Sequence, residues 1–250
     1  MSFEATVERL RGAGSVFAEA EAVLLLAWGG ARVEELLGRR SAGVPLEHLI
    51  GRADFGGLPL RVGPGTFVPR TRTLLLAERI AAVCRPGDRV LDLCCGVGAI
   101  GVYLRAVVPE LEIVGADSDP EAVRWARVNG LTAYAGDLYA ALPPGERFDV
   151  IVANAPYVPA DGIGLMPGEA RDHEPRPTLD GGDDGLRVIA RIVEEAPAQL
   201  RPSGVLGFEV SSAQAEPAVA LFDGQWDAPE LHRDDLGTVA VLTRRVAAAR

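Results

Sequence analysis

The sequence is poor in cysteine and has no metal-ligand pattern. Its three cysteines, of which Cys94 and Cys95 are adjacent, are too few for a disulfide framework and are typical of reduced thiols in a cytoplasmic protein. The three histidines are scattered along the chain, so we expect no metal site. A disulfide-rich secreted domain and a zinc-binding module are therefore excluded.

Excess positive charge and long apolar runs are also missing. The net charge is -10, and none of the 25 basic residues is lysine, so a dedicated binder of duplex nucleic acid is not expected. The longest apolar run, residues 22–28, is far shorter than the roughly 20 residues of a membrane span. The first residues show no basic-then-apolar signal segment. We therefore expect a folded cytoplasmic protein that does not bind membranes.

Strand and helix patterns alternate from residue 74 onward. The pattern predicts an α/β domain with a doubly wound, mostly parallel sheet of the Rossmann-like type. Two late segments, 226–232 and 238–243, are predicted to pair as an antiparallel edge. The predicted strands are 89–93, 112–117, 132–135, 148–153 and 205–210, and the predicted helices are 74–84, 98–108, 119–129 and 186–200.

The residues before this domain have a different pattern. Residues 1–44 look helical, with helices predicted over 16–28 and 31–37. Residues 45–73 form a connecting part that contains a predicted hairpin over 54–62 and a proline-containing loop. We thus divide the chain into 1–44, 45–73 and a main domain over 74–250. The segment 158–179 shows no obvious helix and is long enough to be a lid or substrate-binding loop.

A glycine turn follows the first predicted strand of the main domain. Gly96 and Gly98 lie where the chain passes from strand to helix, and Asp117 ends the next strand. Glycines allow a ligand to approach the backbone, and a carboxylate at this place can accept both hydroxyls of a ribose. Both a dinucleotide and S-adenosylmethionine fit this pattern. The acidic Asp92 leading the turn favours S-adenosylmethionine, which carries a sulfonium and an ammonium.

The third predicted strand is followed by Gly136, Asp137 and Leu138. Asp137 is a candidate acceptor for the amino group of an adenine, with Leu138 packing on the ring. A solvated aspartate in a turn is the alternative interpretation.

The tetrapeptide Asn154–Ala155–Pro156–Tyr157 follows the fourth predicted strand. A bend at Pro156 would present the Asn154 side-chain oxygen and the Ala155 carbonyl together. Two such acceptors bind a planar NH₂ group through both hydrogens, and the Tyr157 ring can stack on its plane. Methylation of an amide or aryl-amine nitrogen needs this arrangement, because orientation and electrostatics must activate a delocalised lone pair.

With these motifs the sequence resembles the HemK/PrmC family of protein-(glutamine) methyltransferases over residues 42–210. The family uses S-adenosyl-L-methionine to methylate the side-chain amide of the glutamine in the Gly-Gly-Gln loop of peptide-chain release factors. Besides the glycine turn and Asp117, the resemblance includes the segments 45–51 (PLEHLIG), 54–58 (DFGGL), 67–70 (FVPR), 136–139 (GDLY), 154–157 (NAPY), 173–175 (HEP), 179–186 (LDGGDDGL) and 208–210 with Gln214.

The resemblance implies roles for individual residues. The implied cofactor-binding residues are Asp92, Cys94, Gly96, Gly98, Asp117, Ser118, Asp137, Leu138 and Asn154. Asn154, Ala155, Pro156 and Tyr157 are implied to be catalytic, and Phe67, Pro69, Arg70, Tyr157 and Glu174 to bind substrate. Residues 1–44 would then recognise the release factor.

The chain also departs from the family pattern. Ala155 replaces the usual proline of the tetrapeptide, and 71–73 read Thr-Arg-Thr where proline and acidic residues are usual. Three alternatives follow: methylation of an exocyclic base amine in nucleic acid, methylation of a small molecule, and a non-catalytic S-adenosylmethionine-binding module. The acidic balance argues against nucleic acid, whose phosphates need cations. The oligomeric state does not follow from the sequence.

Overall fold

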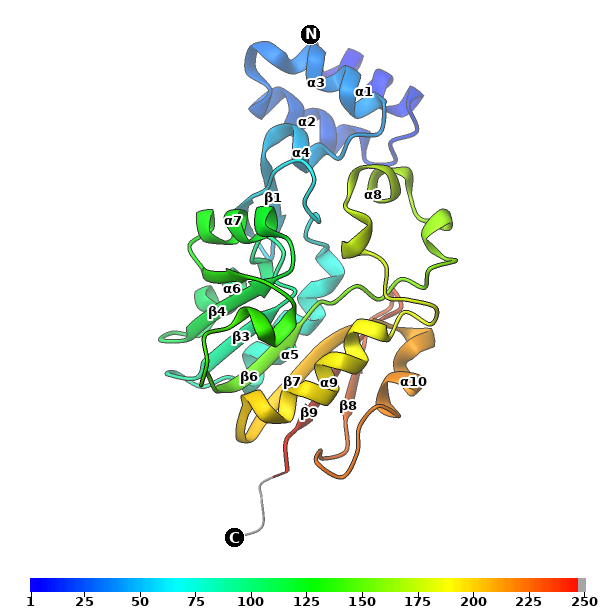
Figure 1. Cartoon of the computed structure of the whole chain (residues 1–250). Coiled ribbons are helices and arrows are strands. Elements are labelled where there is room, and N and C mark those ends of the chain that lie inside the picture. The colour runs from blue at the N-terminus through cyan, green and yellow to red at the C-terminus, as the bar shows by residue number, and fades with distance from the viewer. Residues whose placement is uncertain (247–250) are drawn as a thin grey trace.

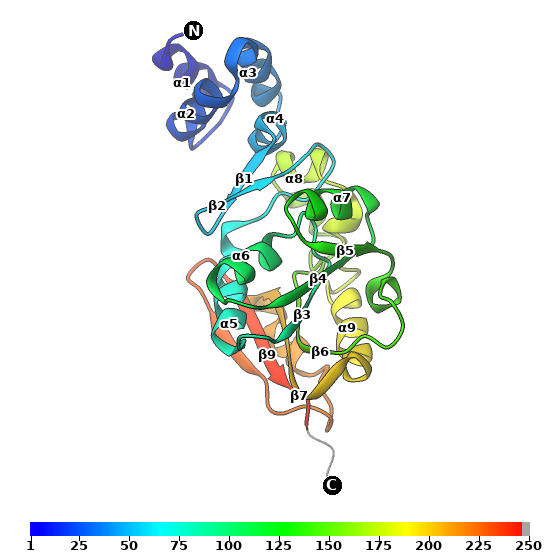
Figure 2. The same ribbon diagram turned by 90° about the vertical axis from the view of Figure 1, so that its left-hand side faces the viewer.

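The computed structural model describes residues 1–246, with a group of helices at one end and a larger α/β domain below it (Figures 1 and 2). The terminal helices are α1 (Phe3–Gly12), α2 (Ala18–Trp28), α3 (Val33–Ser41) and α4 (Leu46–Ile50). They pack around their own apolar core, which includes Leu10, Leu25 and Leu37. The sequence prediction missed α4, a single short turn that begins after Pro45 and ends at the left-handed Gly51.

A two-stranded hairpin connects these helices to the main domain. Strands β1 (Arg52–Phe55) and β2 (Leu58–Arg61) pair antiparallel, which confirms the predicted hairpin. Gly56 and Gly57 between them both have positive φ, as the tight hairpin turn of two residues requires. Phe55 meets the ring of Tyr103 edge to face at 6.0 Å, which fixes the hairpin to the main domain.

The main domain is built on a seven-stranded sheet of order β5-β4-β3-β6-β7-β9-β8. The strands are β3 (Arg89–Leu93), β4 (Glu112–Asp117), β5 (Thr132–Ala135), β6 (Phe148–Ala153), β7 (Leu200–Ser211), β8 (Glu230–Arg233) and β9 (Thr238–Arg244). The first five are parallel, and β9 and β8 close the sheet antiparallel, which confirms the expected α/β class. The strand predicted over 226–232 is shorter than expected and begins at Glu230.

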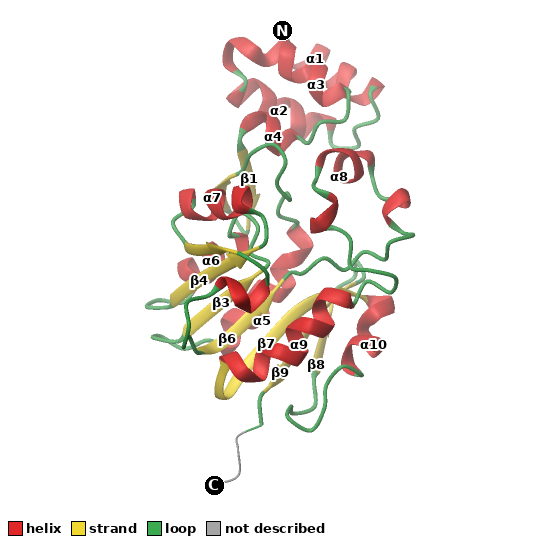
Figure 3. Cartoon of the chain, in the orientation of Figure 1, coloured by secondary structure: helices red, strands yellow, loops and turns green. Residues whose placement is uncertain are grey.

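Side chains alternate along these strands and create an apolar core on each face of the sheet. On one face Val90 and Val152 pack with α5 (Leu74–Val83) and α6 (Ala99–Val107). On the other face Leu91 and Ile151 pack with α9 (Arg187–Gln199) and α10 (Ala215–Val219), as Figure 3 shows for the helix and strand layers. Both faces are therefore covered, as a parallel sheet requires.

The chain order places a crevice at the carboxyl ends of the central strands. From β3 the chain proceeds outward to β4 and, through α7 (Pro120–Val128), to β5, and then returns to β6 on the other side of β3. Ligands of open α/β sheets bind at such a reversal of strand order. The glycine turn after β3 and the tetrapeptide after β6 therefore both face this crevice.

The segment after the tetrapeptide contains a helix, contrary to the expectation from sequence. Within 158–179 lies α8 (Gly168–His173), flanked by two short 3-10 turns. Its position depends on tertiary ion pairs: Arg40 of α3 donates to Glu169 of α8 at 2.6 Å and to Glu21 of α2 at 2.7 Å. In Figure 1, α8 accordingly lies just below the terminal helices. Between residues 1 and 246, no helix combines the length and apolarity needed to cross a bilayer.

Candidate active site

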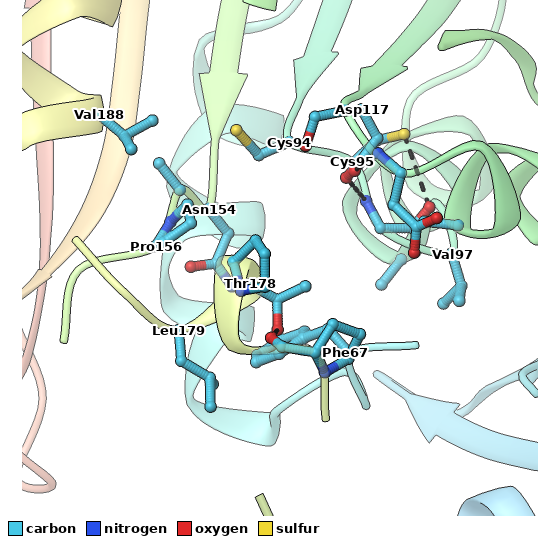
Figure 4. A pocket seen from close by; sticks show the side chains of 18 of the residues that line it. Phe67, Cys94, Cys95, Val97, Asp117, Asn154, Pro156, Thr178, Leu179 and Val188 are labelled. Atoms are coloured by element: carbon cyan, nitrogen blue, oxygen red, sulfur yellow. Dashed lines mark hydrogen bonds between the residues drawn. The ribbon is translucent and has the colours of Figure 1, made fainter. Parts of the chain in front are cut away.

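A cavity of about 510 Å³ lies at the carboxyl ends of β3, β4 and β6, within the size range of small-molecule sites. Its lining includes all the predicted site residues except Gly98 and Glu174. Figure 4 shows Asn154 between the glycine-turn end of the cavity, with Asp117, and the end near Leu179. The predicted residues that line the cavity are Phe67, Pro69, Arg70, Asp92, Cys94, Gly96, Asp117, Ser118, Asp137, Leu138, Asn154, Ala155, Pro156 and Tyr157.

The two glycines of the turn differ in what they do. Gly96 lines the cavity with φ of 54°, and a Cβ there would meet nothing within 4 Å, so the backbone is open to a ligand. Gly98 has φ of 87°, and a Cβ there would lie 2.7 Å from Leu131. Gly98 therefore serves the packing at the start of α6 and does not line the cavity. The sequence led us to expect that Gly98 contacts the cofactor directly.

Asp117 joins the glycine turn to the end of β4. Its Oδ2 accepts from the backbone N–H of Gly96 at 2.8 Å, and its Oδ1 accepts from that of Asp119 at 2.9 Å. Burial raises the pKa of Asp117, while these hydrogen bonds lower it. Each oxygen retains a second acceptor position, so the anchored carboxylate can still accept two hydroxyl hydrogens.

Asp92 is buried beneath the same turn, with 1 % of its surface exposed. Its Oδ2 accepts from Gly101 N–H at 2.9 Å, whereas Oδ1 has no partner among residues 1–246. Burial and, less strongly, the nearby charge of Asp117 raise the pKa of Asp92 to about 8, against the lowering effect of the Gly101 hydrogen bond. A cation in the cavity would compensate both effects, so the site fits a ligand that carries positive charge.

Asp92→Asn is expected to flatten the pH dependence of stability. Because the pKa of Asp92 is raised from 3.8 to about 8, the folded chain holds an extra proton between these values. The free energy of unfolding therefore falls as pH rises through this window, by at most about 1.4 kcal/mol per pH unit from this group. Chemical denaturation of both proteins from pH 5 to 8 measures the slopes, and equal slopes would contradict the expectation.

The turn after β5 is held by an ion pair. Both carboxylate oxygens of Asp137 accept from Arg191 of α9, at 3.0 and 2.9 Å, and both side chains are largely exposed. The carboxylate of Asp137 is therefore already hydrogen-bonded to Arg191 at the cavity rim. Its expected contact with an adenine amino group would compete with Arg191. Leu138, buried and with φ of 45°, forms the apolar wall beside it.

Of the adjacent cysteines, Cys95 is buried and Cys94 is partly exposed at the cavity. Burial raises the pKa of both Cys94 and Cys95, and the charges of Asp92 and Asp117 raise it further. Neutral thiols are poor nucleophiles and poor metal ligands. Cys94 lines the cavity beside Asp117 as a polarisable wall (Figure 4).

The tetrapeptide presents its acceptor atoms to the cavity. The Nδ2 of Asn154 donates to Thr73 Oγ1 at 3.1 Å, which leaves Oδ1 as the atom that faces a ligand. The Tyr157 hydroxyl donates to Glu209 Oε1 at 2.8 Å, and Gln214 Nε2 donates to the Tyr157 carbonyl at 2.8 Å. The side chains of this turn are therefore fixed before any ligand arrives.

The proline loop before α5 forms the opposite wall. Phe67, Pro69 and Arg70 line the cavity, and Arg70 donates to Glu174 Oε1 at 2.6 Å. The Glu174 side chain is fully buried and also accepts from the Val68 N–H at 3.2 Å. Glu174 thus holds the loop from behind and does not line the cavity, so its predicted contact with the substrate would need this loop to move.

Sequence reasoning missed several polar residues around the cavity, among them Asp119 and Thr178. Arg72, Thr73 and Arg191 line it, and Glu209 of β7 lies behind Tyr157. Only Glu209 gave a signal, because a carboxylate within an otherwise apolar buried strand needs a specific partner.

Comparisons with known proteins agree with this geometry. Residues 71–164 match the family model "Methyltransferase small domain". The T. thermophilus 16S rRNA N2 G1207 methyltransferase (RsmC), solved in complex with AdoMet and guanosine, superposes with a TM-score of 0.54 at 25% identity, over 78% of this chain and 49% of that one. The E. cuniculi Mtq2–Trm112 complex, responsible for methylation of the eRF1 termination factor, gives 0.55 at 22% identity, over 72% and 98%.

The sheet order and the cavity at its switch point define a class I S-adenosyl-L-methionine-dependent methyltransferase. The release factor glutamine methyltransferase of Geobacter sulfurreducens is 35% identical over 75% of this chain and 68% of its own length, and that of Mycolicibacterium smegmatis is 36% identical over 85% and 79%. The chain belongs to the family of release factor glutamine methyltransferases.

Proposed function

We propose that this enzyme methylates the side-chain amide nitrogen of a glutamine in a protein, and that the protein is a peptide-chain release factor. The observation that supports this most is the fixed amide of Asn154, whose Nδ2 is held by Thr73 while Oδ1 faces the cavity. An outward carbonyl oxygen accepts a hydrogen from a substrate NH₂ group and rejects a substrate oxygen. The relatives are named release factor glutamine methyltransferases, which supports a release factor as the acceptor.

The chain's own residues do the work of orientation. Asn154 Oδ1 and the Ala155 carbonyl accept the two hydrogens of the substrate amide, while the Tyr157 ring, fixed through Glu209, covers its plane. Accepting both hydrogens polarises the nitrogen and aims its lone pair, so that a strong base is unnecessary. One of the two hydrogens leaves as a proton when the nitrogen is alkylated.

S-adenosyl-L-methionine, when bound, supplies an electrophilic methyl group on a sulfonium that needs no further activation. The residues that would hold it are Gly96 and Asp117 at the ribose end and Leu138 at the ring. Asp92, whose Oδ1 has no partner among residues 1–246, would balance its positive charge. The charge compensation at Asp92 is the feature that distinguishes this cofactor from an anionic dinucleotide.

The same proposal assigns a role to each of the three parts of the chain. Residues 1–44 recognise the protein substrate, 45–73 connect, and 74–250 carry the methyltransferase domain. Exposed apolar side chains on and beside α2, among them Phe17, Val23 and Trp28, offer a surface for a protein partner. Because release factors act on ribosomes, the enzyme is expected to work in the cytoplasm.

The charges at the cavity mouth argue against nucleic acid as substrate. Each arginine there faces a carboxylate of this chain: Arg70 pairs with Glu174, Arg72 lies 3.7 Å from Glu209, and Arg191 pairs with Asp137. Phosphate binding depends on uncompensated cations. A protein substrate therefore fits this mouth better than a flipped base.

Incubation with methyl-labelled S-adenosyl-L-methionine tests the proposal. One tube contains purified release factor, a second contains the same factor with the Gly-Gly-Gln glutamine replaced by asparagine, and a third contains a host lysate. We expect label in the first tube only at that glutamine, mapped by peptide mass spectrometry, and none in the second. Label in the lysate that nuclease removes and protease spares would overturn the proposal.

A further inference from the structure

We infer that Thr73 and Glu209 are positioning residues that set the direction of the hydrogen bonds made by the catalytic tetrapeptide. The inference rests on the proposed function, in which Asn154 must present its oxygen to the substrate. Neither residue belongs to the tetrapeptide or to the glycine turn. Thr73 immediately precedes α5, and Glu209 lies in β7, so three separate elements meet here.

The contacts converge on one buried carboxylate. Glu209 is 1 % exposed, and its Oε1 accepts from the Tyr157 hydroxyl at 2.8 Å. Burial raises the pKa of Glu209, whereas hydrogen bonding from Tyr157 and then Thr73, and the charge of Arg72, lower it. Arg72 Nε is 3.7 Å from Oε1, which supplies the balancing positive charge. The net effect is a raised pKa, and these neighbours offset only part of the cost of burying the carboxylate.

A carboxylate oxygen accepts hydrogen bonds, and Glu209 Oε2 is buried with no hydrogen-bond partner among residues 1–246. The Thr73 hydroxyl, whose interaction with Glu209 lowers the pKa of that carboxyl, is the neighbouring group that can turn its hydrogen toward Glu209 and its lone pairs toward Asn154. Thr73 Oγ1 then accepts from Asn154, and the group that it meets at 3.1 Å must be the NH₂ end of that amide. Asn154 Oδ1 is consequently forced toward the cavity. The buried Glu209 thus sets the orientation of the Thr73 hydroxyl, and Thr73 in turn sets the orientation of the Asn154 amide that faces the substrate.

Thr73→Val removes the acceptor for Asn154 without changing side-chain volume much. Asn154 can then turn its NH₂ end toward the substrate amide, where two donors face each other. We expect kcat to fall about 10- to 100-fold, as for loss of one oriented hydrogen bond. The KM for S-adenosyl-L-methionine should change little, since Thr73 acts on the acceptor side. Thr73→Ser should restore kcat to within about threefold of wild type, because it keeps the hydroxyl.

Thr71→Val is the matched control. Thr71 is exposed, lies two residues away in the same 3-10 turn and does not line the cavity. Its kcat should equal that of the wild-type enzyme. Equal losses in Thr71→Val and Thr73→Val, or no rescue by Thr73→Ser, would overturn the inference in favour of a merely structural effect.

A second readout does not depend on the identity of the methyl acceptor. In protein labelled with ¹⁵N-asparagine, the side-chain NH₂ signals of Asn154 are assigned by their loss in Asn154→Ala. We expect them to be protected from exchange in wild type and Thr73→Ser, and shifted and exchange-broadened in Thr73→Val. Unchanged signals in Thr73→Val would overturn the inference. Absence of label on the release factor with the expected NMR pattern would instead overturn only the proposed substrate.

Discussion

Replacing Asn154 with alanine is expected to lower kcat by about two to three orders of magnitude. The substitution removes one of the two acceptors for the substrate amide, and removal of a single preorganised polar contact to a reacting group lowers kcat by about 10²- to 10³-fold. The loss should appear in kcat, because the contact strengthens as the amide nitrogen is alkylated. Cofactor affinity should fall much less than kcat, since Asp92, Gly96 and Asp117, the other residues expected to hold the cofactor, are unchanged.

Single-turnover kinetics with labelled cofactor, together with thermal unfolding, measures this effect. The chain offers Asn129, its other asparagine, as a control. Asn129 donates to the carbonyls of Arg61 and Val97 and does not line the cavity. Asn129→Ala should lower the melting temperature but leave kcat at saturating cofactor within a few-fold. If Asn154→Ala turned over at a near-normal rate, the orientation mechanism would be wrong.

Asp117→Ala is expected to weaken cofactor binding by about 100-fold or more. The carboxylate is held by the Gly96 and Asp119 amides and has an acceptor position left on each oxygen. Each hydrogen bond from a ribose hydroxyl to a charged acceptor contributes about 1.5–3 kcal/mol. The catalytic step at saturating cofactor should change less than the affinity does.

Titration calorimetry with S-adenosylhomocysteine measures the affinity without turnover. Asp137→Ala is the comparison, because Asp137 also lines the cavity but is already paired with Arg191. We expect a much smaller loss of affinity for Asp137→Ala. Unchanged affinity in Asp117→Ala would refute the ribose assignment, and an equal loss in Asp137→Ala would show that Asp137 leaves Arg191 to bind the adenine.

The parallel strands were predictable because they are short, buried and apolar. Strands β3, β4, β5 and β6 have the bounds predicted from sequence, and the site residues at their carboxyl ends follow from the chain order. β7 was predicted only from residue 205, since its first residues, which include Pro202, do not have a strand pattern. Local patterns thus define the sheet and the cofactor end of the cavity.

The parts that escaped prediction depend on contacts between distant residues. Helix α8 is short and polar, and it is positioned by Arg40, which is 129 residues from Glu169 in the chain. The bond from Tyr157 to Glu209 joins residues 52 apart, and that from Asn154 to Thr73 joins residues 81 apart. No local periodicity encodes such pairs. The burial of Glu174 behind Arg70 is likewise a tertiary property that the local sequence does not encode.

The buried guanidinium of Arg40 limits how this chain can be recombined with its relatives. Arg40 belongs to the terminal helices, yet one of its two carboxylate partners, Glu169, belongs to α8. A chimera that takes residues 1–50 from this chain and the remainder from a relative without an acid at the position of Glu169 would leave Arg40 with Glu21 as its remaining carboxylate partner, which should lower stability. The terminal helices and α8 should therefore be exchanged together in any chimera, although more than a hundred residues separate them in the chain.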